Sequence, residues 1–396
     1  MPRVGDRKKR MDTIQANLEA VLRNGLQAMQ RGDSATARRA FEQVVEAGRA
    51  TTQLWLLLAD ACTADGDATR AHAALDKVLA AEPRNIFALL LKGDLFDGQA
   101  DDRAAISYFR RALSTAAAAG ALPGDLPQRL EEARAKVDLL EKRFESHLAD
   151  QLALAGIADV PPRLAEAIRI ASGRQEVFLQ EPTSFYYPGL PQRAWYDPAE
   201  FGWVAAFEEA AAQLADEVRA VLDEPTGLVP YVEAPSDRPS RGHSLLNDPR
   251  WSAFHLLKDG LTVEENARRC PLAMKLLQSA PIPSIKGRSP MAMVSVLRPG
   301  THIPPHTGML NTRLICHIPL IVPDGCRLRV GAETREVAFG KAMIFDDSME
   351  HEAWNDGDSD RAVLLFEIWR PELDAGERDA LTTVFDSISS YDGDHA

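Results

Sequence analysis

Pro305-His306-Thr307-Gly308 and the later run Glu350-His351-Glu352 are the segments of this sequence on which the prediction of its fold and chemistry rests. They place two imidazoles in a region that otherwise consists of short apolar segments, and Arg361 follows the second. Imidazole is a good ligand for divalent first-row metals. A guanidinium can hold a carboxylate through two parallel hydrogen bonds. The pattern therefore indicates a metal together with an organic acid.

The segments around these residues have β character. Short runs of β-branched and large apolar residues are separated by turn signals such as Pro323-Asp324-Gly325 and Gly340. The expected strands are 251–256, 291–297, 313–320, 326–330, 335–337, 341–345 and 362–369. Short strands at near-regular spacing predict a sandwich or jelly roll and not a parallel α/β sheet. Before them, the sequence predicts helices at about 198–222 and 263–280 and a loop over 224–250.

The N-terminal third has an internal repeat with a period of 34 residues, marked by Asp33, Asp67 and Asp101. A small residue recurs in the first helix of each unit (Gly25, Ala59 and Gly93), and large apolar residues recur in the second at helical spacing (Phe41, Leu75 and Phe109). Helix–turn–helix units of this length resemble the tetratricopeptide repeat over residues 18–118. A helix at about 126–148 is expected to cap the stack. The repeats would bind a partner protein, self-associate or act only as a spacer.

Length and composition limit the class of protein. A chain of 396 residues is expected to form more than one domain, and its net charge of −13 argues against a general nucleic-acid binder. No apolar run approaches the roughly 20 residues of a membrane span, and no signal peptide is visible. The four cysteines lack CxxC spacing, which suits free thiols in a cytoplasmic protein.

These observations predict an α+β multidomain chain. We expect residues 1–17 to be disordered, residues 18–150 to form the helical repeat domain, and residues 151–181 to form a helical linker. Residues 182–396 would form the β domain with its flanking helices. The segment 182–203 is rich in Phe, Tyr, Trp, Pro and Gly. It would either close one end of the β domain or form one wall of a substrate cleft.

The C-terminal region closely resembles the aspartyl/asparaginyl β-hydroxylases over about residues 180–385. The residues that carry the resemblance are His306-Thr307-Gly308, Asn311, Arg313-Leu314, His317, Pro323, Gly325-Cys326, Gly340-Lys341, Phe345-Asp346-Asp347-Ser348, Glu350-His351-Glu352, Trp354, Arg361, Trp369 and Pro371-Glu372-Leu373. The resemblance implies an iron(II)- and 2-oxoglutarate-dependent dioxygenase on a double-stranded β-helix, or jelly roll, that uses O2. Some members also carry helical repeats before this domain.

The resemblance also implies roles for individual residues. His306 and His351 would ligate iron(II). The carboxylate that usually completes such a site, two residues after the first histidine, is replaced by Gly308. That replacement is a feature of this family, in which water fills the position. Arg361, helped by Ser295, would pair with the distal carboxylate of 2-oxoglutarate, and His317 would lie near its other carboxylate.

The implied substrate is the β-carbon of an Asp or Asn residue in a peptide or protein. Arg313 and Arg370 are the main candidates to meet the substrate carboxylate, and Arg288 is a further one. One alternative is a hydroxylase of a free amino acid or of an acyl or other small-molecule substrate. Another is a repeat-containing binding protein whose β domain has lost activity, against which the presence of His306, His351 and Arg361 argues.

Overall fold

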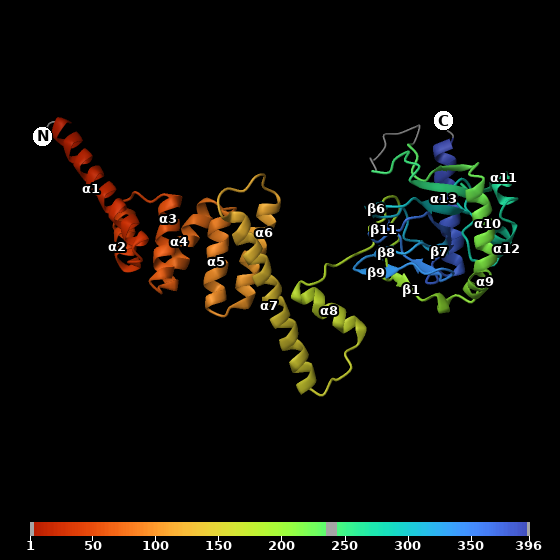
Figure 1. The fold of residues 1–396 in the computed structure, drawn as a ribbon, viewed down its shortest axis with the longest axis horizontal. Helices are drawn as coiled ribbons and strands as arrows, with labels where there is room; N and C mark the ends of the chain where they lie inside the picture. The colour runs from red at the N-terminus through yellow and green to blue at the C-terminus, as the bar shows by residue number, and fades with distance from the viewer. Residues whose placement is uncertain (1–3, 235–243, 394–396) are drawn as a thin grey trace. The chain divides into compact units, whose positions relative to one another are not determined.

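The computed structural model describes residues 4–234 and 244–393, so the part of the expected 224–250 loop at 235–243 lies outside the described residues. The chain forms two compact units that divide between Gln175 and Glu176. This division falls a few residues before Pro182, where the sequence predicts the second domain to begin. Figure 1 shows an all-helical first unit and a second unit built on antiparallel sheets with helices around them.

The first unit consists of helices packed as consecutive antiparallel pairs, as the repeat predicts. The strongest packing joins α1 with α2, α3 with α4, and α5 with α6. The helices are α1 (Val4–Gln30), α2 (Ser34–Glu46), α3 (Thr52–Ala64), α4 (Ala68–Ala81), α5 (Ile86–Gly98), α6 (Asp102–Ala117), α7 (Leu126–Leu154) and α8 (Pro162–Ser172). The tetratricopeptide-like architecture is confirmed.

The repeated aspartates begin the second helix of each pair. The carboxylates of Asp33, Asp67 and Asp101 each accept a hydrogen bond from the backbone N–H three residues later, at 3.0–3.1 Å. This contact satisfies one of the N–H groups that the first helical turn leaves without a partner. The residue before each aspartate has positive φ, and in the third unit it is Ala100 with φ 59°. The turn is therefore the same in all three units even where glycine is absent.

The small residues allow the paired helices to approach closely. A Cβ atom built on Gly93 would lie 2.5 Å from the Phe109 ring, and one on Gly25 would lie 2.6 Å from the Phe41 ring. The middle unit combines Ala59 with the smaller Leu75, and both are buried. The exchange of glycine–phenylalanine for alanine–leucine keeps the filled volume similar, which close-packed interiors require.

We predict that Gly93→Ala destabilises the helical unit by about 1–3 kcal/mol, because the added methyl group must displace the Phe109 ring. Gly98→Ala in the same helix is the matched control, since a Cβ there meets nothing within 4 Å. Alanine is the better helix former, so the control is expected to be neutral or slightly stabilising. Urea denaturation followed by circular dichroism compares the two. Equal stability of both variants would contradict the close approach.

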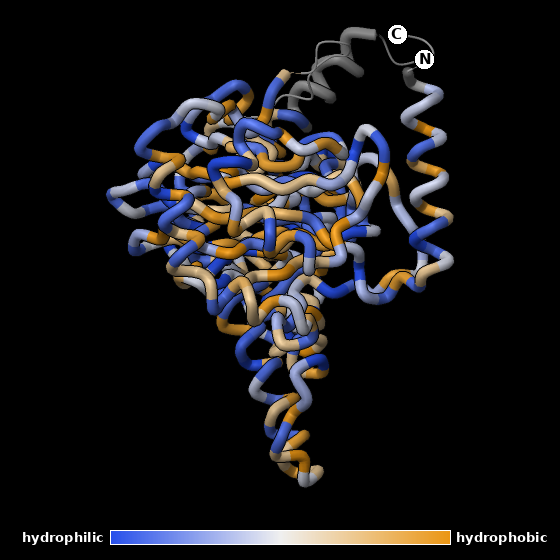
Figure 2. The backbone as a smooth tube through the Cα atoms, turned by 90° about the vertical axis from the view of Figure 1, so that its right-hand side faces the viewer, coloured by the Kyte–Doolittle hydropathy of each residue, from blue (hydrophilic) through white to orange (hydrophobic). Residues whose placement is uncertain are grey.

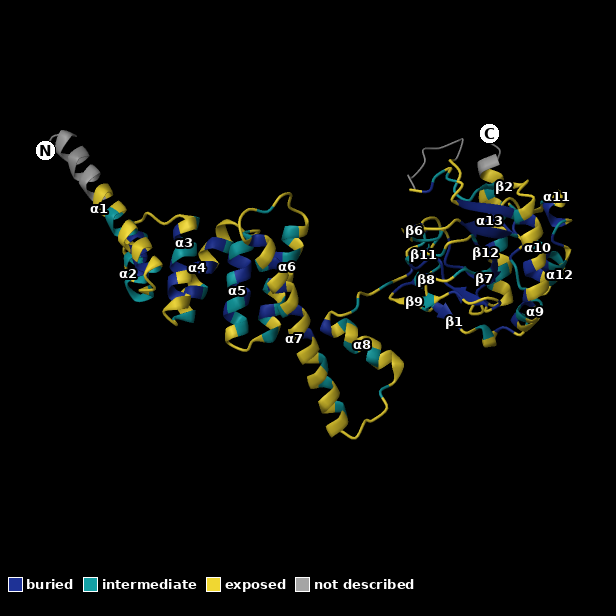
Figure 3. Cartoon of the chain, viewed as in Figure 1, coloured by how far each residue is buried: buried dark blue, intermediate teal, exposed yellow. Residues whose placement is uncertain are grey.

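Two expectations for this unit need correction. Helix α1 begins at Val4, so the described backbone of residues 4–17 is helical and not disordered. Half of the residues in this stretch are good helix formers such as Arg, Lys, Met, Gln and Ala, and the stretch continues without a break into the first repeat helix. The expected linker 151–181 is only partly helical: α7 ends at Leu154 and α8 spans Pro162–Ser172. Figure 3 shows that the C-terminal half of α7 is largely exposed.

The second unit contains two antiparallel sheets that form a jelly roll. The larger sheet has the order β1-β10-β7-β12-β5-β3-β2, with β4 beside β3, and the smaller has the order β6-β11-β8-β9. The larger sheet comprises β1 (Trp195–Tyr196), β2 (Leu228–Pro230), β3 (Trp251–Lys258), β4 (Leu261–Thr262), β5 (Ala292–Leu297), β7 (Arg313–Ile321), β10 (Met343–Phe345) and β12 (Arg361–Trp369). The smaller comprises β6 (Thr301–His306), β8 (Cys326–Val330), β9 (Glu333–Glu336) and β11 (His351–Asn355). The predicted fold class is confirmed.

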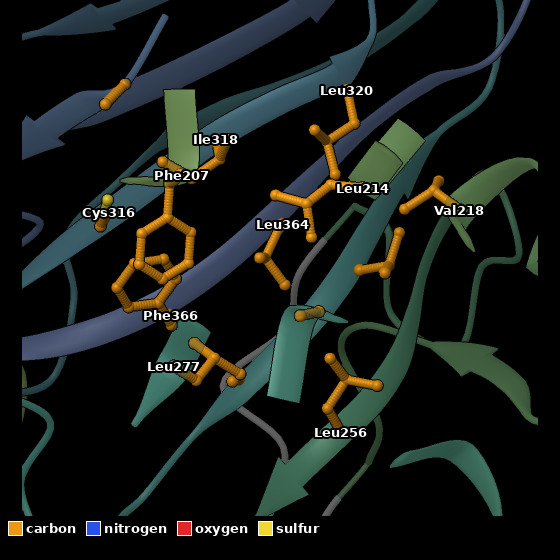
Figure 4. Packing of buried hydrophobic residues seen from close by; sticks show 14 of the residues in the cluster. Phe207, Leu214, Val218, Leu256, Leu277, Cys316, Ile318, Leu320, Leu364 and Phe366 are labelled. Atoms are coloured by element: carbon orange, nitrogen blue, oxygen red, sulfur yellow. The ribbon is translucent and has the colours of Figure 1, made fainter. Parts of the chain in front are cut away.

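Alternation along the strands divides the larger sheet into two faces. Even-numbered residues of β7 and β12, such as Cys316, Ile318 and Phe366, pack against helices on the outer face (Figure 4). Odd-numbered residues, such as Ile315, Val363 and Leu365, pack toward the smaller sheet. The parity of a residue number in these strands therefore decides whether its side chain belongs to the outer core or to the space between the sheets.

The helices of this unit are shorter than the sequence predicts. They are η1 (Pro198–Glu200), α9 (Val204–Glu209), α10 (Ala211–Asp223), α11 (Glu264–Ala267), α12 (Pro271–Leu277) and α13 (Ala375–Gly393). The expected helix 263–280 is divided because Pro271 begins a new helix and cannot continue the old one.

Two strands of the smaller sheet were not among the expected strands: β6, which ends at His306, and β11, which begins at His351.

The aromatic segment 182–203 has a packing role. Phe185, Tyr187 and Leu190 contact a buried cluster that contains Phe385 of α13, and Trp195 joins the core between the sheets. Of the two interpretations of this segment, the contacts favour the closing of one end of the domain.

Figure 2 shows hydrophobic and hydrophilic residues mixed along the chain. Within the described ranges, no helix combines the length and the hydrophobicity of a membrane span.

Candidate active site

Strand pairing brings the two histidines together. His306 ends β6 and His351 begins β11, and the two residues are direct partners in the antiparallel register of these strands. Their ring centroids are 4.1 Å apart. The segments 305–308 and 350–352 therefore meet in the smaller sheet, and both imidazole rings line one cavity.

The hydrogen bonds of both rings fix their tautomers. His306 Nδ1 lies 2.8 Å from the Pro304 carbonyl oxygen, and His351 Nδ1 lies 3.0 Å from the Met349 carbonyl oxygen. A carbonyl oxygen can only accept, so each Nδ1 carries the hydrogen and a neutral ring has its lone pair on Nε2. Burial and the neighbouring His306 lower the pKa of His351 to about 3, which keeps that ring neutral. This is the form of imidazole that ligates metals.

The cavity lies between the two sheets and has a volume of about 510 Å³. Of the residues that the sequence singled out, the structure brings His306, His351, Ser295, His317, Arg313 and Arg361 to its wall. Four of them lie on strands β5, β7 and β12 of the larger sheet. All four have odd residue numbers, so they share the inner face of that sheet. Most of the remaining wall is apolar and includes Met293, Ile315, Leu328, Phe345 and Leu365.

Arg361 is a buried guanidinium that lacks the usual partners. Its Nε and Nη1 atoms are buried without a hydrogen-bond partner among the described residues, and its side chain is 1% exposed. Burial lowers the pKa of this guanidinium to about 10. Buried donors are normally satisfied, so an arginine left in this state calls for an anion that the protein does not itself supply.

Ser295 and His317 lie on the strands beside Arg361. Ser295 Oγ accepts a hydrogen bond from Trp251 Nε1 at 3.2 Å, a contact between strands that the sequence analysis missed because 44 residues separate the two. His317 is buried, and its pKa is lowered well below the ordinary range by burial and by the nearby Arg361. Its ring is therefore neutral and can donate one hydrogen bond and accept another.

A carboxylate reaches the vicinity of Gly308 from another part of the chain. A Cβ atom built on Gly308 would lie 2.1 Å from Asp347 Oδ2, so the absence of a side chain at 308 is required by the position of Asp347. Asp347 lines the cavity, and its Oδ1 is buried without a hydrogen-bond partner among the described residues. Burial raises the pKa of this carboxyl to about 7, and Arg313 opposes that rise.

We predict that Gly308→Ala destabilises the metal-free protein by about 1–3 kcal/mol, because the new methyl group overlaps the Asp347 carboxylate. The same substitution in an Asp347→Ala background removes the obstacle and is expected to cost much less. Thermal denaturation of the four proteins forms a double-mutant cycle. Additive effects would show that Asp347 does not occupy the space beside Gly308.

Arg313 lines the cavity but is already neutralised by acids. It forms ion pairs with Glu367 on β12 and with Asp347, the latter at 3.6 Å. Ser289 Oγ donates to the other Glu367 oxygen. Glu367 is fully buried, and the sequence analysis did not single it out. Glu367 and Arg361 are both odd-numbered residues of β12, so the alternation of side chains along the strand would have placed Glu367 on the same inward face.

Arg370 is not brought to the cavity, so its assignment as a substrate residue is corrected. It follows the last residue of β12, has even parity and is fully buried. Its guanidinium forms an ion pair with Asp346 at 2.6 Å and donates to the carbonyl oxygen of Pro191 at 3.0 Å and to the Tyr196 hydroxyl. Because all these partners are protein groups, Arg370 is a structural residue.

The acids on either side of His351 form ion pairs with an arginine and do not contact its ring nitrogens. Glu350 and Glu352 pair with Arg329, and Glu352 also contacts His302 at 2.8 Å. Backbone carbonyls orient both histidines. In the described parts of the chain, no group of three or more His, Cys, Asp or Glu side chains is arranged to hold a metal ion.

The fold and the cavity define a jelly-roll protein with paired histidines between its sheets, preceded by helical repeats. A family model described as aspartyl/asparaginyl β-hydroxylase matches residues 208–371. Aspartate β-hydroxylase domain-containing protein 2 of Rattus norvegicus is 30% identical over 242 residues, which are 60% of this chain and 68% of that protein. The chain belongs to the aspartyl/asparaginyl β-hydroxylase family.

Two further relatives show the range of the family. The aspartyl/asparaginyl β-hydroxylase of Homo sapiens is 35% identical over 201 residues, which are 50% of this chain and 25% of that protein. The ornithine lipid ester-linked acyl 2-hydroxylase of Rhizobium tropici is 34% identical over 194 residues, which are 48% of this chain and 66% of that protein. The chain thus spans only a quarter of the length of the human relative.

Proposed function

We propose that this chain is an iron(II)- and 2-oxoglutarate-dependent dioxygenase that hydroxylates the β-carbon of an Asp or Asn residue in a peptide or protein. The observation that carries the proposal is one cavity that combines two imidazoles in the ligand tautomer with the buried guanidinium of Arg361. A metal and a dicarboxylate would satisfy both features together. Membership of the family supports the same assignment.

His306 and His351 would hold the iron through Nε2. Their donor set fits iron(II), because imidazole binds first-row divalent metals. Gly308 stands where the usual carboxylate ligand would be and supplies no third protein ligand. Bound iron would allow O2 to oxidise 2-oxoglutarate to succinate and CO2 and to insert one oxygen atom into the substrate C–H bond. The carbonyl acceptors at Pro304 and Met349 would keep both rings in the required orientation.

The protein's own groups would bind and orient the co-substrate. Arg361 would hold the distal carboxylate in two-pronged fashion, with Ser295 as a second donor held in place by Trp251. His317 would lie near the other carboxylate. The apolar wall would exclude water and so strengthen these polar contacts. At the cavity wall, Arg313 would orient the substrate amide or carboxyl, with Glu367 fixing the direction of its guanidinium.

A second candidate is hydroxylation of an acyl group. Two observations favour it: Ile315 contributes an apolar wall, and Arg313 is already paired with two carboxylates. An apolar chain would fit such a wall without requiring an unneutralised cation. The acyl 2-hydroxylase among the relatives is consistent with this candidate.

The helical unit would serve recognition. We infer that its repeats bind a partner protein or self-associate, since stacked repeats of this kind offer an extended concave surface. The proposed division into a repeat domain over 18–150, a linker over 151–181 and an oxygenase domain over 182–396 is consistent with this separation of roles. All four cysteines are free and buried, which supports a cytoplasmic location.

Turnover with defined substrates tests the proposal. The protein is supplied with iron(II), 2-oxoglutarate and O2, together with an Asp- and Asn-containing peptide library, free Asp or an acyl amide. We expect succinate release and the gain of one oxygen atom by a peptide. Oxygen gain only by the acyl amide would establish the second candidate, and gain only by free Asp would establish a small-molecule hydroxylase. No succinate release with any substrate would contradict all three.

A further inference from the structure

A second cavity adjoins the candidate active site. Its volume is about 610 Å³, and four residues line both cavities: His255, Met291, Met309 and Arg313. The two cavities are therefore adjacent and are bounded in part by the same four side chains. Two of the shared residues are methionines, whose flexible side chains adapt to varied partners.

The second cavity is cationic, although the chain as a whole has a net charge of −13. Lys258, Arg288 and Arg313 line it, and Asp259 is the acid among its lining residues. Two of these cations already have carboxylate partners. Lys258 lies 3.4 Å from Glu233, and Arg313 is paired with Glu367 and Asp347.

Arg288 is different, because no ion pair involves it among the described residues. Its Nε donates to Ser389 Oγ at 3.2 Å, and its guanidinium carbon lies 5.4 Å from the centre of the Phe385 ring. Both contacts come from α13 and hold one edge and one face of the guanidinium. The terminal Nη groups remain to bind an anion in two-pronged fashion, the geometry for which arginine is suited.

We propose that this second cavity is a subsite for an acidic side chain of a peptide substrate, and that Arg288 is the residue that recognises it. The inference rests on the proposed function and narrows its substrate class. The substrate would carry a carboxylate at a distance in sequence from the hydroxylated residue, so a free amino acid would be too small to use both sites. Complementary charge would contribute specificity and speed of association.

Peptide binding tests the subsite without turnover. Fluorescent peptides contain a target Asp and one Glu placed at successive positions on either side of it, and matched peptides have Gln in place of that Glu. We expect the wild-type protein to bind one or more Glu peptides about tenfold more tightly than their Gln counterparts. Fluorescence anisotropy measures the affinities. Arg288→Met should abolish the preference, and Arg288→Lys should retain part of it.

The matched control is Arg219→Met, since Arg219 is an exposed arginine of α10 that pairs only with the neighbouring Asp216 among the described residues. This variant should keep the full preference. A preference for Glu that survives Arg288→Met, or no preference at any position, would overturn the subsite. Binding of anionic lipid vesicles that depends on Arg288, without preference among peptides, would also overturn it. Succinate release, measured separately, reports on the proposed function: Arg288-dependent peptide binding without hydroxylation would retain the subsite and refute the hydroxylation.

Discussion

Arg361→Met is expected to abolish high-affinity binding of 2-oxoglutarate and at the same time to stabilise the protein that lacks it. The Nε and Nη1 atoms of Arg361 are buried without a hydrogen-bond partner among the described residues. Two charge-assisted hydrogen bonds to a carboxylate would be lost, which corresponds to at least about a hundredfold weaker binding. Removing a buried charge that lacks a partner should raise the free energy of unfolding by about 1–3 kcal/mol.

The two readouts are measured by anaerobic 2-oxoglutarate titration and by thermal denaturation without ligand. Arg361→Lys is the control, because it retains the charge but not the planar pair of donors, and it should bind with intermediate affinity. Loss of binding together with loss of stability would mean that Arg361 holds the fold together. That result would contradict its assignment to the co-substrate.

Arg370→Met is expected to have the opposite effect on stability, although Arg370 is equally buried and directly follows the other end of the same strand. Its ion pair with Asp346 is completely buried, and Gln180 Nε2 also donates to Asp346 at 2.7 Å. Removal of one partner leaves a buried charge uncompensated, which costs about 3–5 kcal/mol. Chemical denaturation should show this loss.

Arg250→Met is the control for this prediction, since Arg250 forms an ion pair with Asp248 while its side chain is 59% exposed. Exposed pairs contribute about 0–1 kcal/mol. A double replacement, Arg370→Met with Asp346→Leu, should recover part of the lost stability because it leaves no buried charge. A stability loss for Arg370→Met no larger than that of the control would refute the structural role.

The sequence predicted the helical repeats well because their determinants are local. The Asp at each N-cap, the positive-φ residue before it and the small residue facing a large apolar side chain all recur with the period of 34. Such features act within one pair of helices. The helix that begins at Val4 was not predicted. The division at Pro271 has a local cause, since a proline cannot continue the preceding helix, but the prediction of one helix over 263–280 gave it no weight.

The site could be predicted only in part. His306 and His351 come together through the register of β6 and β11, which no local pattern in the sequence fixes; the resemblance to a family supplied it. Alternation along β12 could have shown that Arg370 does not face the space between the sheets and that Glu367 does. By contrast, the overlap of Gly308 with Asp347 and the contact of Trp251 with Ser295 depend on tertiary packing. These contacts required the folded structure.

The central claim is that His306 and His351 hold iron(II) beside 2-oxoglutarate. It is tested most directly by anaerobic titration of the protein with iron(II) and 2-oxoglutarate, followed through the metal-to-ligand absorption band. We predict that the band forms in the wild-type protein and in His302→Ala, since His302 lies on the same strand but pairs with Glu352 outside the cavity. The band should be lost in His306→Ala. Absence of the band in the wild type, or an unaltered band in His306→Ala, would contradict the account.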